Sequence, residues 1–461
     1  MEAVKIRTKN PLGYQPIGHL LMRFAIPSVV SMLVNALYNI VDQIFIGTGV
    51  GYLGNAATTV SFPLQTIILA LGTMIGAGAS AYAAIKLGEK REQEAEHTLG
   101  NAFFMLVLAG IIIMVVGLVF LEPILYLFGA TAKNFAYSQD YASIILLGTV
   151  FNLLGIGLSN MARTDGSPNI AMLSMIAGAV LNTILDPIYI FVFHWGVKGV
   201  ILVYYFLKKS TMRLHISQMK IKKTIFVSIL SLGFSSCITQ TAATIMQVVM
   251  NNSLVYYGDL TSTTGDVALS AMGIVLKISM IITSICIGIG IGAQPILGFN
   301  KGARQPKRIK ETYKKASSIA VLTSIIGWGV CIAIPGVILS LFGSSDPVFS
   351  TFAQRAMRIY MLGIFTAGFQ ITATSYFQAT GQPLKASVLS MMRQLILLIP
   401  LILILPLFFG LDGILFAGPI ADISSGIVVF VFISKEMKKL NAQIALETEE
   451  ELGVYNDELV M

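Results

Sequence analysis

Charged residues are scarce in this chain. Only 12% of its 461 residues are charged, about half of the roughly 25% found in soluble domains, and its mean hydropathy is +0.78. Apolar runs of about 20 residues recur from end to end, which is the length of a helix that crosses a bilayer. The runs are continuous and do not alternate apolar with polar residues, so we do not expect strands. The sequence therefore predicts an all-α membrane protein with many spans.

Cysteines and catalytic motifs are also scarce. The three cysteines, Cys237, Cys286 and Cys331, lie in different apolar runs without CxxC spacing, so we expect them to fill helix contacts. The run "GIGIGA" at 288–293 is not a nucleotide loop, because no strand precedes it and no GK[ST] follows. No Walker, Ser–His or HExxH pattern occurs. We therefore expect neither an enzyme, nor direct use of ATP, nor an organic cofactor.

Basic residues alternate between the connections, which predicts the orientation of the chain. We expect twelve spans, at residues 20–46, 56–84, 99–121, 136–160, 169–192, 194–207, 224–250, 266–297, 315–342, 352–378, 384–407 and 412–434. Of the 31 Lys and Arg residues, 25 fall at the termini and on every second loop, which the positive-inside rule places in the cytoplasm. Both termini are therefore predicted to be cytoplasmic. Contact with anionic membrane lipids is a second expectation for these loops, and nucleic-acid binding is not expected.

The two halves of the chain resemble each other. "KLGEK" (86–90) matches "NKGAR" (300–304), "ARTDGSPNIAMLSMI" (162–176) matches "FQATGQPLKASVLSMM" (377–392), and the offset stays at 214 to 216. Six spans per half give both halves the same orientation, so an axis along the membrane normal relates them. The predicted organisation is an N-terminus (1–19), an N-lobe (20–207), a basic linker (208–223), a C-lobe (224–434) and an acidic tail (435–461). Two such lobes with a substrate route between them indicate a transporter.

Several motifs in combination resemble the multidrug and toxic compound extrusion (MATE) family, closest to its DinF/MepA-like bacterial branch. They are "IPSVVSMLVNALYNIVDQIFIG", "GTMIGAGASAYAAIKLGEK", "ARTDGSPN", "LNTILDPIYIF", "IGIGAQPILGFNKGA" and "FQATGQPLKAS". The resemblance implies a monomeric secondary antiporter of a bacterial cytoplasmic membrane. It would export amphipathic, cationic compounds in exchange for H⁺ or Na⁺. The alternatives are a lipid-linked precursor flippase of the same superfamily and a membrane protein that transports nothing.

Two carboxylates lie within apolar spans of the N-lobe. Asp42 is in "YNIVDQIFIG" and Asp186 is in "NTILD", although a charge at the bilayer centre costs about 2.5–3.5 kcal/mol. Tyr38 and Asn182 precede them by four residues, which places each pair on one helix face. Such a group can hold Na⁺ or share a proton, or both carboxylates can be structural. The resemblance implies that Asp42, Asn182 and Asp186 bind the coupling ion.

Three other N-lobe residues complete the predicted site by resemblance: Tyr38, Pro27 and Asn152. Pro27 removes a backbone hydrogen bond from the first span and can kink it. Protonation of Asp42 would favour a bent helix if the two protonation states prefer different shapes. A packing kink without a functional role is the alternative.

The C-lobe lacks the two acids of the N-lobe. The repeat places residues 249–251 opposite Asp42 and Pro400 opposite Asp186, and none of these is acidic. The intramembrane charges of the C-lobe are instead Lys277, Arg393 and Asp422. We expect the two cations to pair with carbonyls or reach the interface, with Asp422 as a counter-charge for one of them.

The sixth span is predicted to be short or incomplete. Gly199 to Lys208 covers 9 residues, whereas the matching stretch from Gly413 to Lys435 covers 22. As a helix, residues 194–207 would span about 21 Å of a hydrocarbon core about 30 Å thick. Either the crossing is short or broken, or a segment is missing from the chain, and we favour the second reading. The resemblance implies a threonine on this helix that completes the ion site. If the segment is truly deleted, a Na⁺ site loses that ligand and H⁺ is the expected coupling ion.

Overall fold

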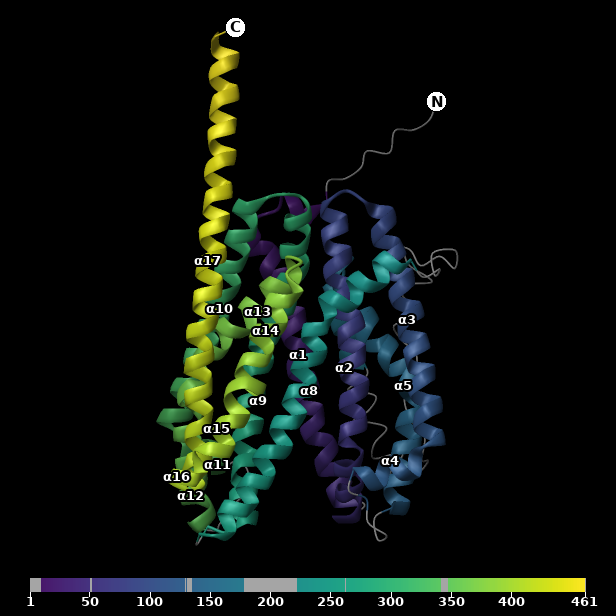
Figure 1. Cartoon of the computed structure of the whole chain (residues 1–461), viewed down its shortest axis with the longest axis vertical. Coiled ribbons are helices and arrows are strands. Elements are labelled where there is room, and N and C mark those ends of the chain that lie inside the picture. Colours follow the sequence, from purple (N-terminus) through teal and green to yellow (C-terminus); the bar gives the residue numbers. More distant parts are fainter. Residues whose placement is uncertain are drawn as a thin grey trace.

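The computed structural model describes residues 10–49, 52–128, 130, 135–177, 222–261, 263–340 and 347–460, and every regular element in these ranges is helical. Figure 1 shows two groups of long, roughly parallel helices, with α2 to α5 in one group and α9 to α17 in the other, while α1 and α8 cross between the groups. The predicted all-α architecture with two lobes is confirmed. We use "terminal end" for the end of the molecule at which α1 begins and from which α17 projects, and "far end" for the opposite one.

The N-lobe consists of long helices joined by short connections. Its elements are η1 (Pro11–Gly13), α1 (Ile17–Gly49), α2 (Tyr52–Gly88), α3 (Glu92–Val119), α4 (Leu121–Leu127) and α5 (Phe135–Thr164). A further apolar helix over Pro168–Ala177 is the described part of the fifth predicted span. The sixth predicted span, 194–207, lies outside the described residues, so its length stays a prediction.

The C-lobe repeats this plan with more interruptions. Its elements are α8 (Lys223–Asp259), α9 (Gly265–Gly302), α10 (Pro306–Ala333), α11 (Pro335–Ser340), α12 (Pro347–Tyr360), η4 (Met361–Thr366), α13 (Ala367–Ala379), α14 (Pro383–Met391), η5 (Met392–Leu398), α15 (Ile399–Ile404), α16 (Pro406–Phe409) and α17 (Leu411–Val460). Here η4 is a 3-10 segment and η5 a π-helical one. The tenth predicted span is therefore three consecutive segments rather than one α-helix.

Nine helices in the described part of the chain are long and apolar enough to cross a membrane. Two of them start well before the predicted apolar run, since α3 begins at Glu92 and α10 at Pro306. The first turns of these helices carry charged side chains, which water solvates outside the bilayer. A prediction from hydropathy marks only the apolar part of such a helix and misses the charged turns. For the same reason α17 runs on as a helix through the predicted tail and projects beyond the other helices (Figure 1).

Matching turns show the internal repeat in the backbone. Helix α2 ends before Lys90 at φ 62°, and helix α9 ends before Arg304 at φ 53°, both unusual values for residues other than glycine. The closing hydrogen bonds also match: Arg91 N donates to Lys86 O and Gln305 N to Asn300 O, each at 2.9 Å. A left-handed residue with such a bond is a common helix C-cap.

A second matching pair of turns lies between the fourth and fifth spans of each half. Gly166 has φ 82° and Gly381 has φ 77°, and glycine adopts this left-handed conformation without a steric cost. Both pairs of turns keep the sequence offset of the repeat.

The lobes touch through glycines at the terminal end. A Cβ atom on Gly88 would lie 1.9 Å from the carbonyl oxygen of Phe299, and one on Gly302 would lie 1.9 Å from that of Ile85. The two contacts are the same contact with the halves exchanged, because Ile85 and Phe299 are themselves repeat partners. The pseudo-two-fold axis therefore passes between the ends of α2 and α9.

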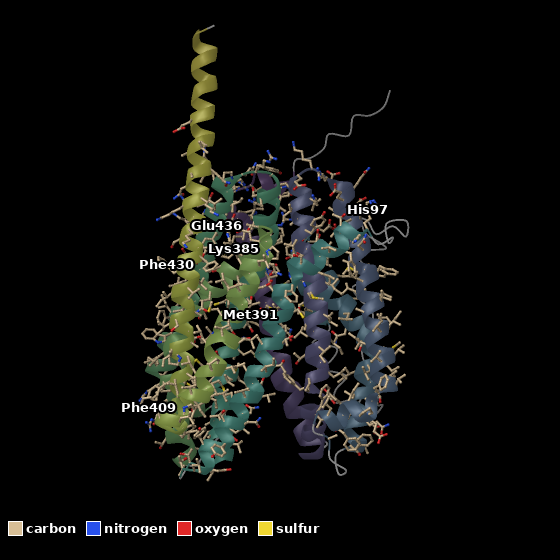
Figure 2. The ribbon with its side chains drawn as sticks, in the orientation of Figure 1. His97, Lys385, Met391, Phe409, Phe430 and Glu436 are labelled. Atoms are coloured by element: carbon tan, nitrogen blue, oxygen red, sulfur yellow. The ribbon has the colours of Figure 1, made fainter. Side chains whose placement is uncertain are left out.

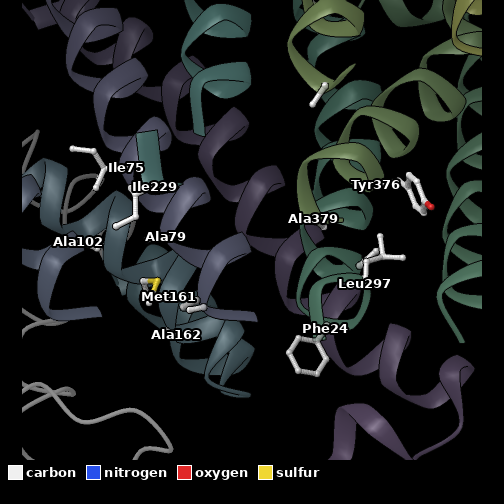
Figure 3. Packing of buried hydrophobic residues seen from close by; sticks show 14 of the residues in the cluster. Phe24, Ile75, Ala79, Ala102, Met161, Ala162, Ile229, Leu297, Tyr376 and Ala379 are labelled. Atoms are coloured by element: carbon white, nitrogen blue, oxygen red, sulfur yellow. The ribbon is translucent and has the colours of Figure 1, made fainter. Parts of the chain in front are cut away.

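The first helix of each half packs on the opposite half. A Cβ on Gly233 of α8 would lie 1.7 Å from Met74 O of α2, and Ile75 and Ile229 lie close together in Figure 3. On the other side of the axis, a Cβ on Gly292 of α9 would lie 2.6 Å from the Cα of Ala25 in α1. Only glycine permits such close approach of two backbones.

Hydrogen bonds hold the start of each half against the other. Arg308 of α10 donates from Nη2 to Leu12 O at 3.0 Å and to Gln15 O at 2.8 Å, just before α1. Asn101 of α3 accepts from Lys222 N, just before α8, at 2.9 Å. At the terminal end the C-lobe thus binds the segment before α1, and the N-lobe binds the segment before α8.

We expect Gly88→Ala and Gly302→Ala each to lower the stability of the purified protein by about 1–3 kcal/mol, because the added methyl meets a carbonyl of the other lobe. The measurement is the thermal midpoint in detergent. Gly148→Ala is the matched control, since a Cβ there meets no described atom within 4 Å and alanine favours the helix. Equal midpoints for Gly88→Ala and Gly148→Ala would contradict the proposed close contact.

Candidate functional site

Helix α1 carries the first predicted coupling residue. Its backbone is helical from Ile17 to Gly49 and includes Tyr38 and Asp42, while its side chains are described only as far as Leu37. Asn182 and Asp186 lie outside the described residues. The approach of Asp42 to Asp186, and the binding of an ion by them with Asn182, therefore stay predictions.

Pro27 lies inside α1 and is buried. Because proline has no N–H, it leaves the carbonyl oxygen one turn earlier without its helical partner. The neighbouring serines bond to the backbone, Ser28 Oγ to Phe24 O at 2.9 Å and Ser31 Oγ to Pro27 O at 2.8 Å, an interaction that often bends helices. Helix α1 therefore lacks one backbone hydrogen bond at Pro27, and two serine hydroxyls bond to backbone carbonyls close to it.

The part of α1 around Pro27 packs on the C-lobe. Residues on both sides of Pro27 pack on α9: a Cβ on Gly292 would meet Ala25 and one on Gly288 would lie 2.5 Å from the Cα of Val29. Asp42 lies 15 residues further on, about 22 Å along the helix axis. The first part of α1 is therefore packed against the C-lobe, and Asp42 lies about four turns further along the helix.

Asn152, the remaining N-lobe candidate, lies in the middle of α5 with an exposed side chain. The neighbouring residue Leu153 is fully buried and packs beside Gly72 of α2. The exposed amide is therefore not part of the apolar packing between α2 and α5.

Two of the three C-lobe charges form a largely buried ion pair. Arg393 Nε donates to Asp422 Oδ1, with 27% of the arginine side chain and 5% of the aspartate side chain exposed. Asp422 is thus the counter-charge of Arg393 and not of Lys277. Lys277, on α9, is partly buried and forms no ion pair with any described residue.

Three further polar residues bond to each other and to the backbone carbonyl of Asp422. Gln370 Nε2 donates to Asp422 O at 2.9 Å, Thr366 Oγ1 donates to the same oxygen at 3.2 Å, and Ser425 Oγ donates to Gln370 Oε1 at 2.7 Å. Thr366, Gln370 and Ser425 were not predicted from the sequence. A signal existed for Gln370, since it interrupts the apolar run "MLGIFTAGFQ".

The ion pair lies between two departures from α-helical geometry. Arg393 is in the π-helical η5, and Thr366 ends the 3-10 segment η4. Such segments inside long helices often mark functional or strained positions. The bonds from Thr366 and Gln370 to the backbone oxygen of Asp422 tie η4 and α13 to α17, and the ion pair ties η5 to α17.

A second polar link joins three C-lobe helices. Gln378 of α13 accepts from Gln294 Nε2 of α9 at 3.2 Å and donates to Leu232 O at 3.2 Å and Ser236 Oγ at 3.0 Å on α8. Near the terminal end, Lys385 Nζ lies 3.0 Å from Glu436 Oε2, and Figure 2 shows the two side chains together, far from Phe409. These contacts tie the C-lobe together.

The described residues contain no group of three or more His, Cys, Asp or Glu that could hold a metal ion. Cys286 and Cys331 are buried and Cys237 is partly buried, and the Sγ of Cys286 lies 3.3 Å from Ser324 Oγ. The thiols thus occupy helix contacts, as predicted.

Comparison with known proteins agrees with this fold. The MatE family model matches residues 27–188 and 235–404. The multidrug export protein MepA of Staphylococcus haemolyticus (strain JCSC1435) is 26% identical over 424 residues, covering 87% of this chain and 90% of that protein. MepA of Staphylococcus aureus (strain MRSA252) is 26% identical over 426 residues, covering 88% and 91%.

Solved structures give the same result. The MATE multidrug transporter DinF-BH is 34% identical with a TM-score of 0.82, covering 90% of this chain and 95% of that one. An outward-facing MATE family transporter of the MOP superfamily is 23% identical with a TM-score of 0.86, covering 94% and 99%, and so supports the fold alone. Because the family model matches well over half of its residues, this chain belongs to the MatE family of multi-pass membrane proteins.

Proposed function

We propose that this protein is a multidrug efflux antiporter that exports amphipathic, cationic compounds in exchange for H⁺ or Na⁺. The observation that carries the proposal is the match to MepA, a multidrug export protein, along 87% of the chain. The likeness to the multidrug transporter DinF-BH, at 34% identity, supports it further. We place the protein in a bacterial cytoplasmic membrane as a monomer, with both termini inside and no organic cofactor.

The proposed coupling site is Asp42, Asn182 and Asp186. In the predicted orientation the terminal end faces the cytoplasm, and Asp42 lies near the outer end of α1. Deprotonated Asp42 and Asp186 would accept the ion from outside and release it inward as substrate leaves. Asn152 and Tyr38 would support the carboxylates.

The packing of α1 on α9 suggests how ion binding at Asp42 would change the shape of the helix. The part of α1 near Ala25 and Val29 is held against α9, and a change of charge at Asp42 would act on the part of the helix beyond these contacts. Pro27 has already lost one helical hydrogen bond, so bending there costs less than elsewhere in the helix, although the bend must release Val29 from α9. A shift of population between a straight and a bent α1 would then couple the ion to substrate release.

Asp42→Asn is expected to abolish coupled efflux while leaving folding intact, because it removes the titrating group and keeps the volume. The measurement is efflux of ethidium, a fluorescent organic cation, from proteoliposomes with a defined ion gradient. Asp140→Asn is the matched control, since Asp140 is an exposed carboxylate near the start of α5. Transport at the wild-type rate by well-folded Asp42→Asn protein would contradict coupling at this residue.

The coupling ion has its own test. We expect a pH gradient alone to drive ethidium efflux from Na⁺-free proteoliposomes, because the sixth span lacks the threonine that would complete a Na⁺ site. Each gradient is imposed separately at zero membrane potential, and the initial rates are compared. Efflux that requires a Na⁺ gradient and ignores a pH gradient would show that the site binds Na⁺ without that threonine.

The C-lobe ion pair is expected to be structural rather than coupling. Arg393→Met strands the buried Asp422 carboxylate and should lower stability by about 3–5 kcal/mol, whereas Arg393→Met/Asp422→Leu should recover most of the loss. The thermal midpoint measures both effects, and the double variant should still transport when a pH gradient is applied. A stable double variant that has lost all coupling would assign the pair to transport instead.

A further inference from the structure

A groove of about 340 Å³ opens on the surface of the molecule between the two halves of the chain. One side of the groove is the start of α1, which belongs to the N-lobe. The other side is the first half of α10, which belongs to the C-lobe. Its lining includes Gly18, Leu21 and Met22 from α1 and Lys314, Lys315 and Ile319 from α10. The groove thus spans the boundary between the lobes near the terminal end.

The rim of the groove is positively charged. Lys315 Nζ lies 2.7 Å from Glu311 Oε1 and would lie 3.6 Å from a Cβ on Gly18, so this amine reaches over α1. Its pairing with Glu311 is exposed, and such surface pairs hold a side chain only weakly. Lys314 is exposed and forms no ion pair with any described residue. Among the described residues, at least one full positive charge at the groove therefore has no acidic partner.

The groove continues into an apolar strip. On α1, Met22 is 52% exposed and Ile26, one turn further, is 51% exposed. On α10, Ile319 is 40% exposed and Leu322, about one turn further, is 59% exposed. These side chains lead away from the lysines along the two helices toward the middle of both spans. An amphiphile with a negative head and apolar tails matches this arrangement, and a soluble anion does not use the strip.

We propose that the groove binds an anionic phospholipid from the membrane leaflet that surrounds the terminal end of the protein. Its phosphate lies between the ammonium groups of Lys314 and Lys315, and its acyl chains follow Met22, Ile26, Ile319 and Leu322. Because α1 and α10 come from different lobes, the bound lipid favours the arrangement in which α1 rests against the C-lobe. The proposal depends neither on the coupling ion nor on the exported compound.

Native mass spectrometry of the full-length protein, exchanged into mixed micelles, tests the site. Phosphatidylglycerol and phosphatidylcholine with identical acyl chains are the two probes. We expect wild-type protein to retain phosphatidylglycerol preferentially and to melt at a higher temperature with it. Lys314→Gln/Lys315→Gln should reduce that preference roughly tenfold. Lys438→Gln/Lys439→Gln removes two adjacent exposed lysines from α17 and should keep the wild-type preference.

A second variant separates a shaped site from general attraction of anionic lipid. Gly18→Leu keeps every charge and fills the groove, and only the flexible tip of Lys315 would come within 4 Å of its Cβ. Leucine also favours the helix over glycine, so folding is not at risk. We expect Gly18→Leu to lose retained phosphatidylglycerol as well. The proposal is overturned if wild-type protein shows no lipid preference, or if both groove variants retain phosphatidylglycerol as the wild type does.

Discussion

The close approach of α2 and α9 at the pseudo-two-fold axis is the constraint on which the rest of the structure depends. The reciprocal contacts of Gly88 with Phe299 O and of Gly302 with Ile85 O leave no room for any side chain. They bring the two lobes together at the terminal end, and the crossings of α1 on α9 and α8 on α2 follow beside them. The hydrogen bonds that Arg308 donates and that Asn101 accepts then secure the start of each half.

A nearly symmetric scaffold carries asymmetric chemistry. The turns at Lys90 and Arg304 repeat in the backbone, yet the intramembrane acids of the N-lobe have no counterparts in the C-lobe, whose buried charge is neutralised by the pair of Arg393 and Asp422. In the proposed mechanism this division has a role, because the C-lobe gives α1 a surface to rest on while the N-lobe carboxylates titrate. The titrating carboxylates would then move one lobe relative to a fixed partner.

Much of the fold could be predicted from the sequence, because apolar runs, basic loops and a constant repeat offset are all local patterns. The Gly166 and Gly381 turns, for example, were visible as matching motifs. Non-local features could not be predicted: a π-helical segment at Arg393, a 3-10 segment before Ala367, and the hydrogen bonds of Gln370 depend on packing between helices. Charged helix ends were also misplaced, because hydropathy does not mark where a helix stops in water. The N-lobe site rests on resemblance, since two of its members lie outside the described residues.

The most direct test of ion exchange at Asp42 is a binding measurement without a membrane. Purified protein in weakly buffered detergent receives an organic cation, and a pH-sensitive dye reports protons released as the cation binds. The account predicts proton release in wild-type protein, or release of ²²Na⁺ from protein preloaded with it, and neither in Asp42→Asn protein that still binds the cation. Binding by wild-type protein with release of neither ion would contradict the account.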